Sequence, residues 1–157
     1  MANDATVTIS ATILPDEIAK TISGTMTVTP ADVSEKWYFK KTSVTTTSTD
    51  LIAGEYIDHT AIAVGATGMV EVATGDQIRF LLVQNQSSSD GIMLSIDGGA
   101  AAYNLADGIY IGPSETWFGR LPSVTVADLH AISSDLDGAG DASATCLVAA
   151  LLHDVSI

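Results

Sequence analysis

A strict alternation of apolar and hydroxyl side chains near the N-terminus limits the folds that this chain can adopt. Thr or Ser alternates with Val, Ile or Ala over residues 6–13, and a similar pattern returns over residues 22–29. Successive side chains of a β-strand point to opposite faces, so the pattern predicts strands with one apolar face and one Thr-lined face. Pro15 and Asp16 separate the two runs, and Pro30 ends the second. We therefore expect an antiparallel strand pair.

The remainder continues in short extended segments divided by Gly, Pro, Asp and Ser turns. Residues 36–41 read as a strand, and the Thr- and Ser-rich residues 42–49 as either an exposed edge strand or a polar arm. The further predicted strands are 62–64, 69–72, 78–84, 92–96, 109–111, one opening at 117, 129–132 and 142–152. Such regular spacing is typical of a sandwich or barrel.

We accordingly predict an all-β fold, an antiparallel β-sandwich or jelly-roll-like arrangement. No amphipathic helix longer than a turn or two is indicated. The 157 residues suit a single β domain. Within it we expect an N-terminal β segment over residues 1–65 and a sandwich module over residues 66–157.

Composition and charge exclude some classes of partner. Hydrophobic residues make up 46% of the chain, which is enough for a core and argues against disorder. There are 19 acidic residues against 6 basic ones, a net charge of −13. A field of that sign opposes approach to a phosphate backbone, so we expect no nucleic-acid partner.

The single cysteine and the termini bear on the compartment. Cys146 stands in an apolar alternating run and has no second cysteine to pair with, so we expect a buried core residue rather than a nucleophile. Folding then needs no oxidising compartment. The N-terminus is acidic, unlike a secretory signal, and no apolar run reaches the length of a membrane span. We expect a protein made and dissolved in the cytoplasm, with no membrane partner.

One loop resembles a calcium site. Residues 135–141 place Asp135, Asp137 and Asp141 among glycines, partly like an EF-hand loop. The fifth position holds Ala139, however, and Cys146 stands where the bidentate Glu is required. Because strands are expected on both sides, we favour a plain hairpin turn over a calcium site.

Other chemistry finds little support. The histidines His59, His130 and His153 lie far apart in sequence, whereas a zinc site needs at least three convergent ligands. No nucleophile elbow and no phosphate-binding loop are present. We predict no catalytic, cofactor-binding or metal-binding residues, and a protein that is not an enzyme.

A candidate interface surrounds the third strand. Trp37, Tyr38, Lys40 and Lys41, together with Lys36 and Phe39, combine three aromatic side chains with half of the basic residues. Such residues are favoured at interfaces, and the patch would suit an acidic partner. In the alternative, which we favour, Trp37 and Phe39 face the core and the lysines line a solvated edge that discourages strand pairing.

Residues 75–148 resemble a pattern found in small structural proteins of tailed-phage virions. The matching elements are an apolar strand running into Asn (78–85), a strand ending in Asp-Gly (92–98), the turn 112–115, an aromatic strand at 117–118, the segment 126–133, and a Gly-rich turn before a last apolar strand. The likeness covers about half of the chain and has no counterpart in the N-terminal half.

This resemblance implies a capsid decoration or cement protein, or else a component of a tail or fibre. It implies residence in the virion, the major capsid protein as partner, a homo-oligomer of the trimer type, and no cofactor. A carbohydrate-binding β-sandwich module is a further alternative, and it would need exposed aromatic side chains, such as Trp37 and Trp117, on a flat platform.

Overall fold

The computed structural model describes residues 4–13, 20–54, 71–135, 138–139 and 142–155. It divides the chain into two compact units, Met1–Asp32 and Val33–Ile157. No helix among the described residues is long and apolar enough to cross a membrane.

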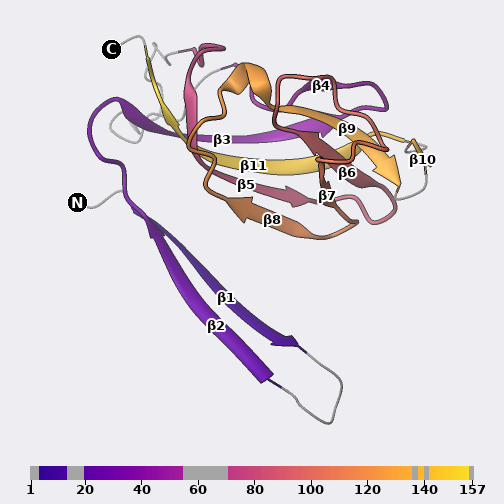
Figure 1. The fold of residues 1–157 in the computed structure, drawn as a ribbon, viewed down its shortest axis with the longest axis horizontal. Helices are drawn as coiled ribbons and strands as arrows, with labels where there is room; N and C mark the ends of the chain where they lie inside the picture. The colour runs from indigo at the N-terminus through magenta and orange to yellow at the C-terminus, as the bar shows by residue number, and fades with distance from the viewer. Residues whose placement is uncertain (1–3, 14–19, 55–70, 136–137, 140–141, 156–157) are drawn as a thin grey trace. The chain divides into compact units, whose positions relative to one another are not determined.

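The first unit is a two-stranded antiparallel ribbon (Figure 1). Strands β1 (Ala5–Ile13) and β2 (Lys20–Val28) pair along their whole length, from Ala5 opposite Val28 to Ile13 opposite Lys20. The alternation in sequence is thereby converted into two distinct faces, one apolar and one formed by Thr and Ser pairs. The predicted antiparallel pair is confirmed.

The second unit consists of two antiparallel sheets. In the first, here called the β11 sheet, the strand order is β3 (Glu35–Val44), β11 (Ala144–His153), β5 (Gln77–Asn85) and β8 (Thr116–Gly119). In the second, the β9 sheet, the order is β10 (Gly138–Ala139), β9 (His130–Asp135), β6 (Gly91–Ser95) and β7 (Ile109–Ile111), and β4 (Thr49–Asp50) also pairs with β9.

The chain crosses between the sheets at nearly every step. From β3 it passes to β4, back to β5, across to the neighbouring pair β6 and β7, back to β8, across to β9, and finally to β11. The orders β3-β11-β5-β8 and β4-β9-β6-β7 are those of an eight-stranded jelly roll. The predicted all-β antiparallel sandwich is confirmed. Apart from strands, the described elements include a single 3-10 turn, Val126–Asp128.

The core lies between the sheets. The β11 sheet contributes buried side chains that include Tyr38, Leu81, Val83, Cys146, Val148 and Ala150, and the β9 sheet contributes Ile92, Leu94, Ile111 and Ala131. Burying one large aliphatic side chain stabilises the fold by roughly 1.5–3 kcal/mol. Cys146 is a free, fully buried thiol, as expected from its apolar surroundings in the sequence.

The boundary inside the chain differs from the expected one at residue 65. Strand β3 pairs with β11 and β4 pairs with β9, so the sandwich already includes residues 35–50. Residues 42–44 complete β3, and the Thr-rich segment then turns into β4. The strand predicted at 62–64 and most of the one at 69–72 lie outside the described residues.

Candidate functional site

Strand β3 presents its aromatic residues to two different sides of the sheet. Tyr38 is 1% exposed and belongs to the core between the sheets. Trp37 and Phe39 therefore face away from that core, and Phe39 is 52% exposed. The favoured expectation that Trp37 and Phe39 would face the core is wrong. Alternation correctly places Trp37 and Phe39 on one side of β3 and Tyr38 on the other. The side that faces the core is that of Tyr38, which it shares with Val44.

The outward set continues across all four strands. Phe39 of β3 is level with Ala149 of β11, which is level with Leu82 of β5 and then Phe118 of β8. This row of apolar side chains runs from one edge of the sheet to the other. Because neighbouring strands lie about 4.8 Å apart, adjacent members of the row can pack side by side.

A second row lies next to the first. Trp37 is level with Leu151, which is level with Phe80, and the Trp37 and Phe80 rings meet edge to face with centroids 6.2 Å apart. On the other side of the Phe39 row, Lys41 is level with Leu147. We call this side, formed by Trp37, Phe39, Phe80, Leu82, Phe118, Leu147, Ala149 and Leu151, the outer face of the β11 sheet. Phe80 and Leu151 are buried at 2% and 1% exposed, whereas Phe39 is exposed and the other members are partly exposed.

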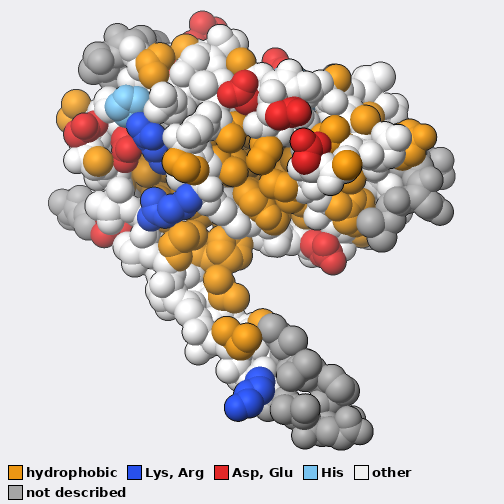
Figure 2. All heavy atoms as spheres, in the orientation of Figure 1, with side chains coloured by type: hydrophobic (Ala, Val, Ile, Leu, Met, Phe, Trp, Pro, Cys, Tyr) orange, Lys and Arg blue, Asp and Glu red, His pale blue; other side chains and the backbone are white. Residues whose placement is uncertain are grey.

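Basic residues surround the outer face. Lys41 is exposed beside Leu147, and Arg120 is exposed directly after β8. Arg79 lies at an irregularity of β5 and its Nε is 3.6 Å from Glu35 Oε1. Three of the six basic residues of an acidic chain thus border one apolar surface, and Arg79 shares its place there with the acidic Glu35. Figure 2 shows hydrophobic side chains gathered over the middle of this unit, with Lys and Arg side chains at one end.

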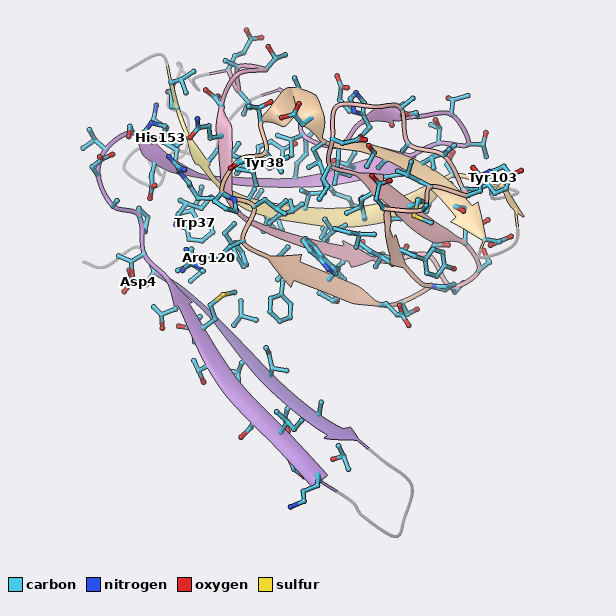
Figure 3. All side chains as sticks on the ribbon, in the orientation of Figure 1. Asp4, Trp37, Tyr38, Tyr103, Arg120 and His153 are labelled. Carbon is cyan, nitrogen blue, oxygen red and sulfur yellow. The ribbon has the colours of Figure 1, made fainter. Side chains whose placement is uncertain are left out.

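The four predicted interface residues are divided by the structure. Trp37 and Lys41 lie on the outer face, and Figure 3 places Trp37 and Arg120 at the same end of the sheet. The Tyr38 hydroxyl donates to the Ala53 carbonyl at 3.2 Å, and burial raises the pKa of this phenol. Lys40 Nζ donates to the same carbonyl at 3.0 Å. Tyr38 and Lys40 therefore hold the segment after β4 against β3.

The third lysine is not on a solvated edge. Lys36 is 8% exposed, and its Nζ lies 3.0 Å from Asp154 Oδ2, which is also buried. A buried ion pair of this kind is costly to break from one side, because the remaining charge stays desolvated. Lys36 thus has a structural role in fastening the end of the chain after β11, whereas Lys40 and Lys41 are exposed as expected.

The other candidates for chemistry do not converge. His130 Nε2 lies 3.3 Å from Asp50 Oδ1, and His153 Nδ1 lies 3.0 Å from Ser34 Oγ. His59 lies outside the described residues. Among the described residues, no group of three His, Cys, Asp or Glu side chains is placed to hold a metal ion. The expected hairpin is present in part, since β9 and β10 pair, but residues 136–137 and 140–141 of that loop lie outside the described residues.

The platform required for glycan stacking is not formed by the two tryptophans. Trp117 is level with Val83 and packs against the core, whereas Trp37 is level with Leu151 on the outer face. The two indoles are therefore on opposite sides of the same sheet.

One signal in the sequence could have identified the outer face. Residues 144–153 of β11 are almost continuously apolar, and strands with both faces covered have that composition, whereas half-exposed strands alternate. Comparisons of the chain with protein-family models, with curated proteins and with solved structures found no match.

Proposed function

We propose that this protein is a structural component of a phage virion, a capsid decoration or cement protein that binds the outside of the assembled shell through the outer face of the β11 sheet. The major capsid protein is the partner, and the protein acts as a homo-oligomer, a trimer. It has no catalytic role. Because it binds the assembled shell and not the separate subunits, binding stabilises the shell by linkage.

The observation that carries this proposal is the second apolar face of the β11 sheet. A sheet that needs only one core would alternate apolar and polar side chains, yet Phe39, Leu82 and Phe118 form an apolar row on the side away from that core. Contiguous exposed apolar surface on a soluble domain marks an interaction site. Aromatic and Arg side chains, such as Trp37 and Arg120, supply much of the binding energy of interfaces.

The charge distribution supports an acidic partner. Lys41, Arg79 and Arg120 border the outer face, whereas the chain as a whole carries a net charge of −13. Opposite potentials favour encounter with an acidic surface and disfavour a basic one. The partner surface is therefore apolar at its centre and acidic at its border.

Two further observations support the proposal by analogy. Jelly rolls occur in viral capsid and lectin domains, although a fold does not imply a function. The resemblance of residues 75–148 to tailed-phage virion proteins covers strands β5 to β11, which include three of the four strands of the β11 sheet.

The test uses shells assembled without this protein. Purified protein added to such shells is expected to bind and to raise their thermal and osmotic resistance. Phe39→Asp should lower the binding affinity at least tenfold. Tyr103→Asp is the matched control, since Tyr103 is also an exposed aromatic, 43% against 52%, but lies in the loop between β6 and β7. Shells that neither bind the protein nor gain resistance would refute the proposal.

A tail or fibre component is the second candidate, and the ribbon β1–β2 favours it. An extended two-stranded element that is paired along nine residues of each strand suits attachment to an elongated assembly. Incubation of labelled protein with purified heads and purified tails distinguishes the two candidates, because each predicts retention by one particle part.

A further inference from the structure

The ribbon β1–β2 has two faces of different chemistry. On one face Val7 is level with Met26, and Ala11 with Ile22; Ile9, with Gly24 opposite, is 40% exposed. The other face consists of hydroxyl pairs, Thr6 with Thr27, Thr8 with Thr25, Ser10 with Ser23 and Thr12 with Thr21. One face of the ribbon is thus apolar except for Lys20, which is opposite Ile13 at one end, and the other face is entirely polar.

An isolated two-stranded ribbon is marginally stable in water, and an apolar face needs a cover. Ile22 is 58% exposed on that face, and there is open space within 4 Å of the position that a Cβ would occupy at Gly24. The ribbon therefore offers an apolar surface with room for side chains of another surface.

Charge identifies what can cover it. Copies of a chain with net charge −13 repel one another, so they can approach most easily where charge is absent. Strands β1 and β2 contain one charged residue, Lys20, at the start of β2. Lys20 lies at the end of the apolar face, opposite Ile13. Between Lys20 and the other end, the face presents the same uncharged surface to each copy and is therefore self-complementary.

We propose that the apolar face of the ribbon is the self-association surface, on which ribbons from different copies of this chain pack face to face. The inference rests on the homo-oligomer of the proposed function and names the element that forms it. The Thr and Ser face remains in contact with solvent.

The expected area makes this association weak. Nine residues at about 3.4 Å each give a ribbon about 30 Å long, and two strands are about 10 Å wide. One face therefore offers at most about 300 Å², since Val28 at one end of it is already buried. Two facing ribbons bury about 600 Å², and three around an axis about 900 Å², below the ~1,200 Å² of standard stable interfaces. The oligomer should consequently dissociate on dilution.

The experiment is light scattering on a sizing column over a series of protein concentrations. The full chain is expected to move from the mass of one chain to a multiple of it as concentration rises. Ile22→Lys should shift that transition to at least tenfold higher concentration. Ser23→Lys, the neighbouring residue on the polar face, adds the same charge and should leave the transition unchanged.

A second pair of variants guards against simple unfolding of the ribbon. Ile9→Cys and Ser10→Cys each place one thiol at the centre of β1, on opposite faces. Under mild oxidation, Ile9→Cys should form covalent dimers at a several-fold higher yield than Ser10→Cys. A wild-type chain of single mass at every concentration, or equal cross-linking by both variants, would overturn the inference.

These outcomes are separable from those of the shell assay. An oligomer held by the ribbon that fails to bind shells would refute the proposed function and leave the inference standing. The opposite result is a chain that binds shells but stays a single copy in solution, with equal cross-linking of both variants. That result would refute the inference on the ribbon and leave the proposed binding to shells standing.

Discussion

The two sheets of the sandwich treat their outward faces differently. On the β9 sheet, Met93, Tyr110 and Ile132 form a second small cluster, covered by Ala101 and Leu105 from the loop between β6 and β7. On the β11 sheet, the outward residues Phe80 and Leu151 are also buried, but Phe39 on the edge strand β3 is 52% exposed. Met93, by contrast, is 7% exposed.

The covering loop of the β9 sheet is fixed by specific hydrogen bonds. Asp97 Oδ1 accepts from Ser95 Oγ at 2.6 Å and from the Gly99 amide at 2.9 Å. The Ala101 amide donates to Ser48 Oγ at 2.8 Å. The chain thus devotes a loop to covering one outward face. Outward apolar side chains therefore contribute to stability where the chain covers them, and where they stay exposed they are open to the binding that we propose.

The largest expected effect comes from the covered face. Met93→Ala should lower the free energy of unfolding by about 2–4 kcal/mol, because it leaves a cavity beneath Ala101 and Leu105. Phe39→Ala removes a larger side chain from the exposed face and should cost less than about 1 kcal/mol. Urea denaturation followed by tryptophan fluorescence measures both. Equal losses would show that the two faces do not differ.

The strands themselves could be predicted from sequence because their signals are local. Alternation identifies β1 and β2, and turn residues delimit β5 and β6. The strand order could not be predicted, since it depends on pairing between distant segments. Val44 pairs with Ala144, a hundred residues later, and the intervening pattern contains no information on that partner.

Only part of the candidate site could be predicted from the sequence, because the rest depends on contacts between distant segments. Alternation places Trp37 and Phe39 together and Tyr38 opposite, but it does not say which side meets the second sheet. Lys36 was also misplaced, since its partner Asp154 lies 118 residues away and makes burial of the charge possible.

Thiol labelling tests the difference between the two outward faces directly. Burial raises the pKa of Cys146 to about 11, two units above its ordinary value, so its thiolate fraction near pH 8 is about 100-fold lower than in the unfolded chain. In the native protein Cys146 should label very slowly. An added thiol at Phe39→Cys should label rapidly, whereas one at Met93→Cys should be slow like Cys146.

The same raised pKa has a consequence for stability. The folded protein holds the proton of the Cys146 thiol more tightly than the unfolded chain does. The resulting contribution to the free energy of unfolding is therefore fully present below the ordinary pKa near 9 and is lost as the pH rises toward 11. The slope approaches 1.4 kcal/mol per pH unit in that window. Cys146→Ala should flatten that part of the profile, and an unchanged slope would contradict the assignment.

A smaller effect is expected where the covering loop is fastened. Ser48→Ala removes the acceptor of the Ala101 amide and should cost about 1 kcal/mol. Amide hydrogen exchange at Ala101 should accelerate as the loop opens more often. Thr46→Ala, which removes an exposed hydroxyl nearby, is the control. Unaltered exchange in Ser48→Ala would mean that this bond does not hold the cover.

The smallest effect concerns acid stability of the same loop. The hydrogen bond from Ser95 and then that from Gly99 lower the pKa of Asp97 below 3.8. Because the folded-state pKa is depressed, the contribution is present above pH 3.8 and is lost as the pH falls through the lower folded value. Asp97→Asn should therefore reduce the pH dependence of unfolding below pH 3.8 by a small amount. Asp107→Asn, which removes a carboxylate elsewhere in the loop, should retain that dependence. If the two variants show the same acid profile, the turn at Asp97 is not what fastens the cover over the β9 sheet, and the contrast with the exposed β11 sheet then rests on Ser48 and on apolar packing alone.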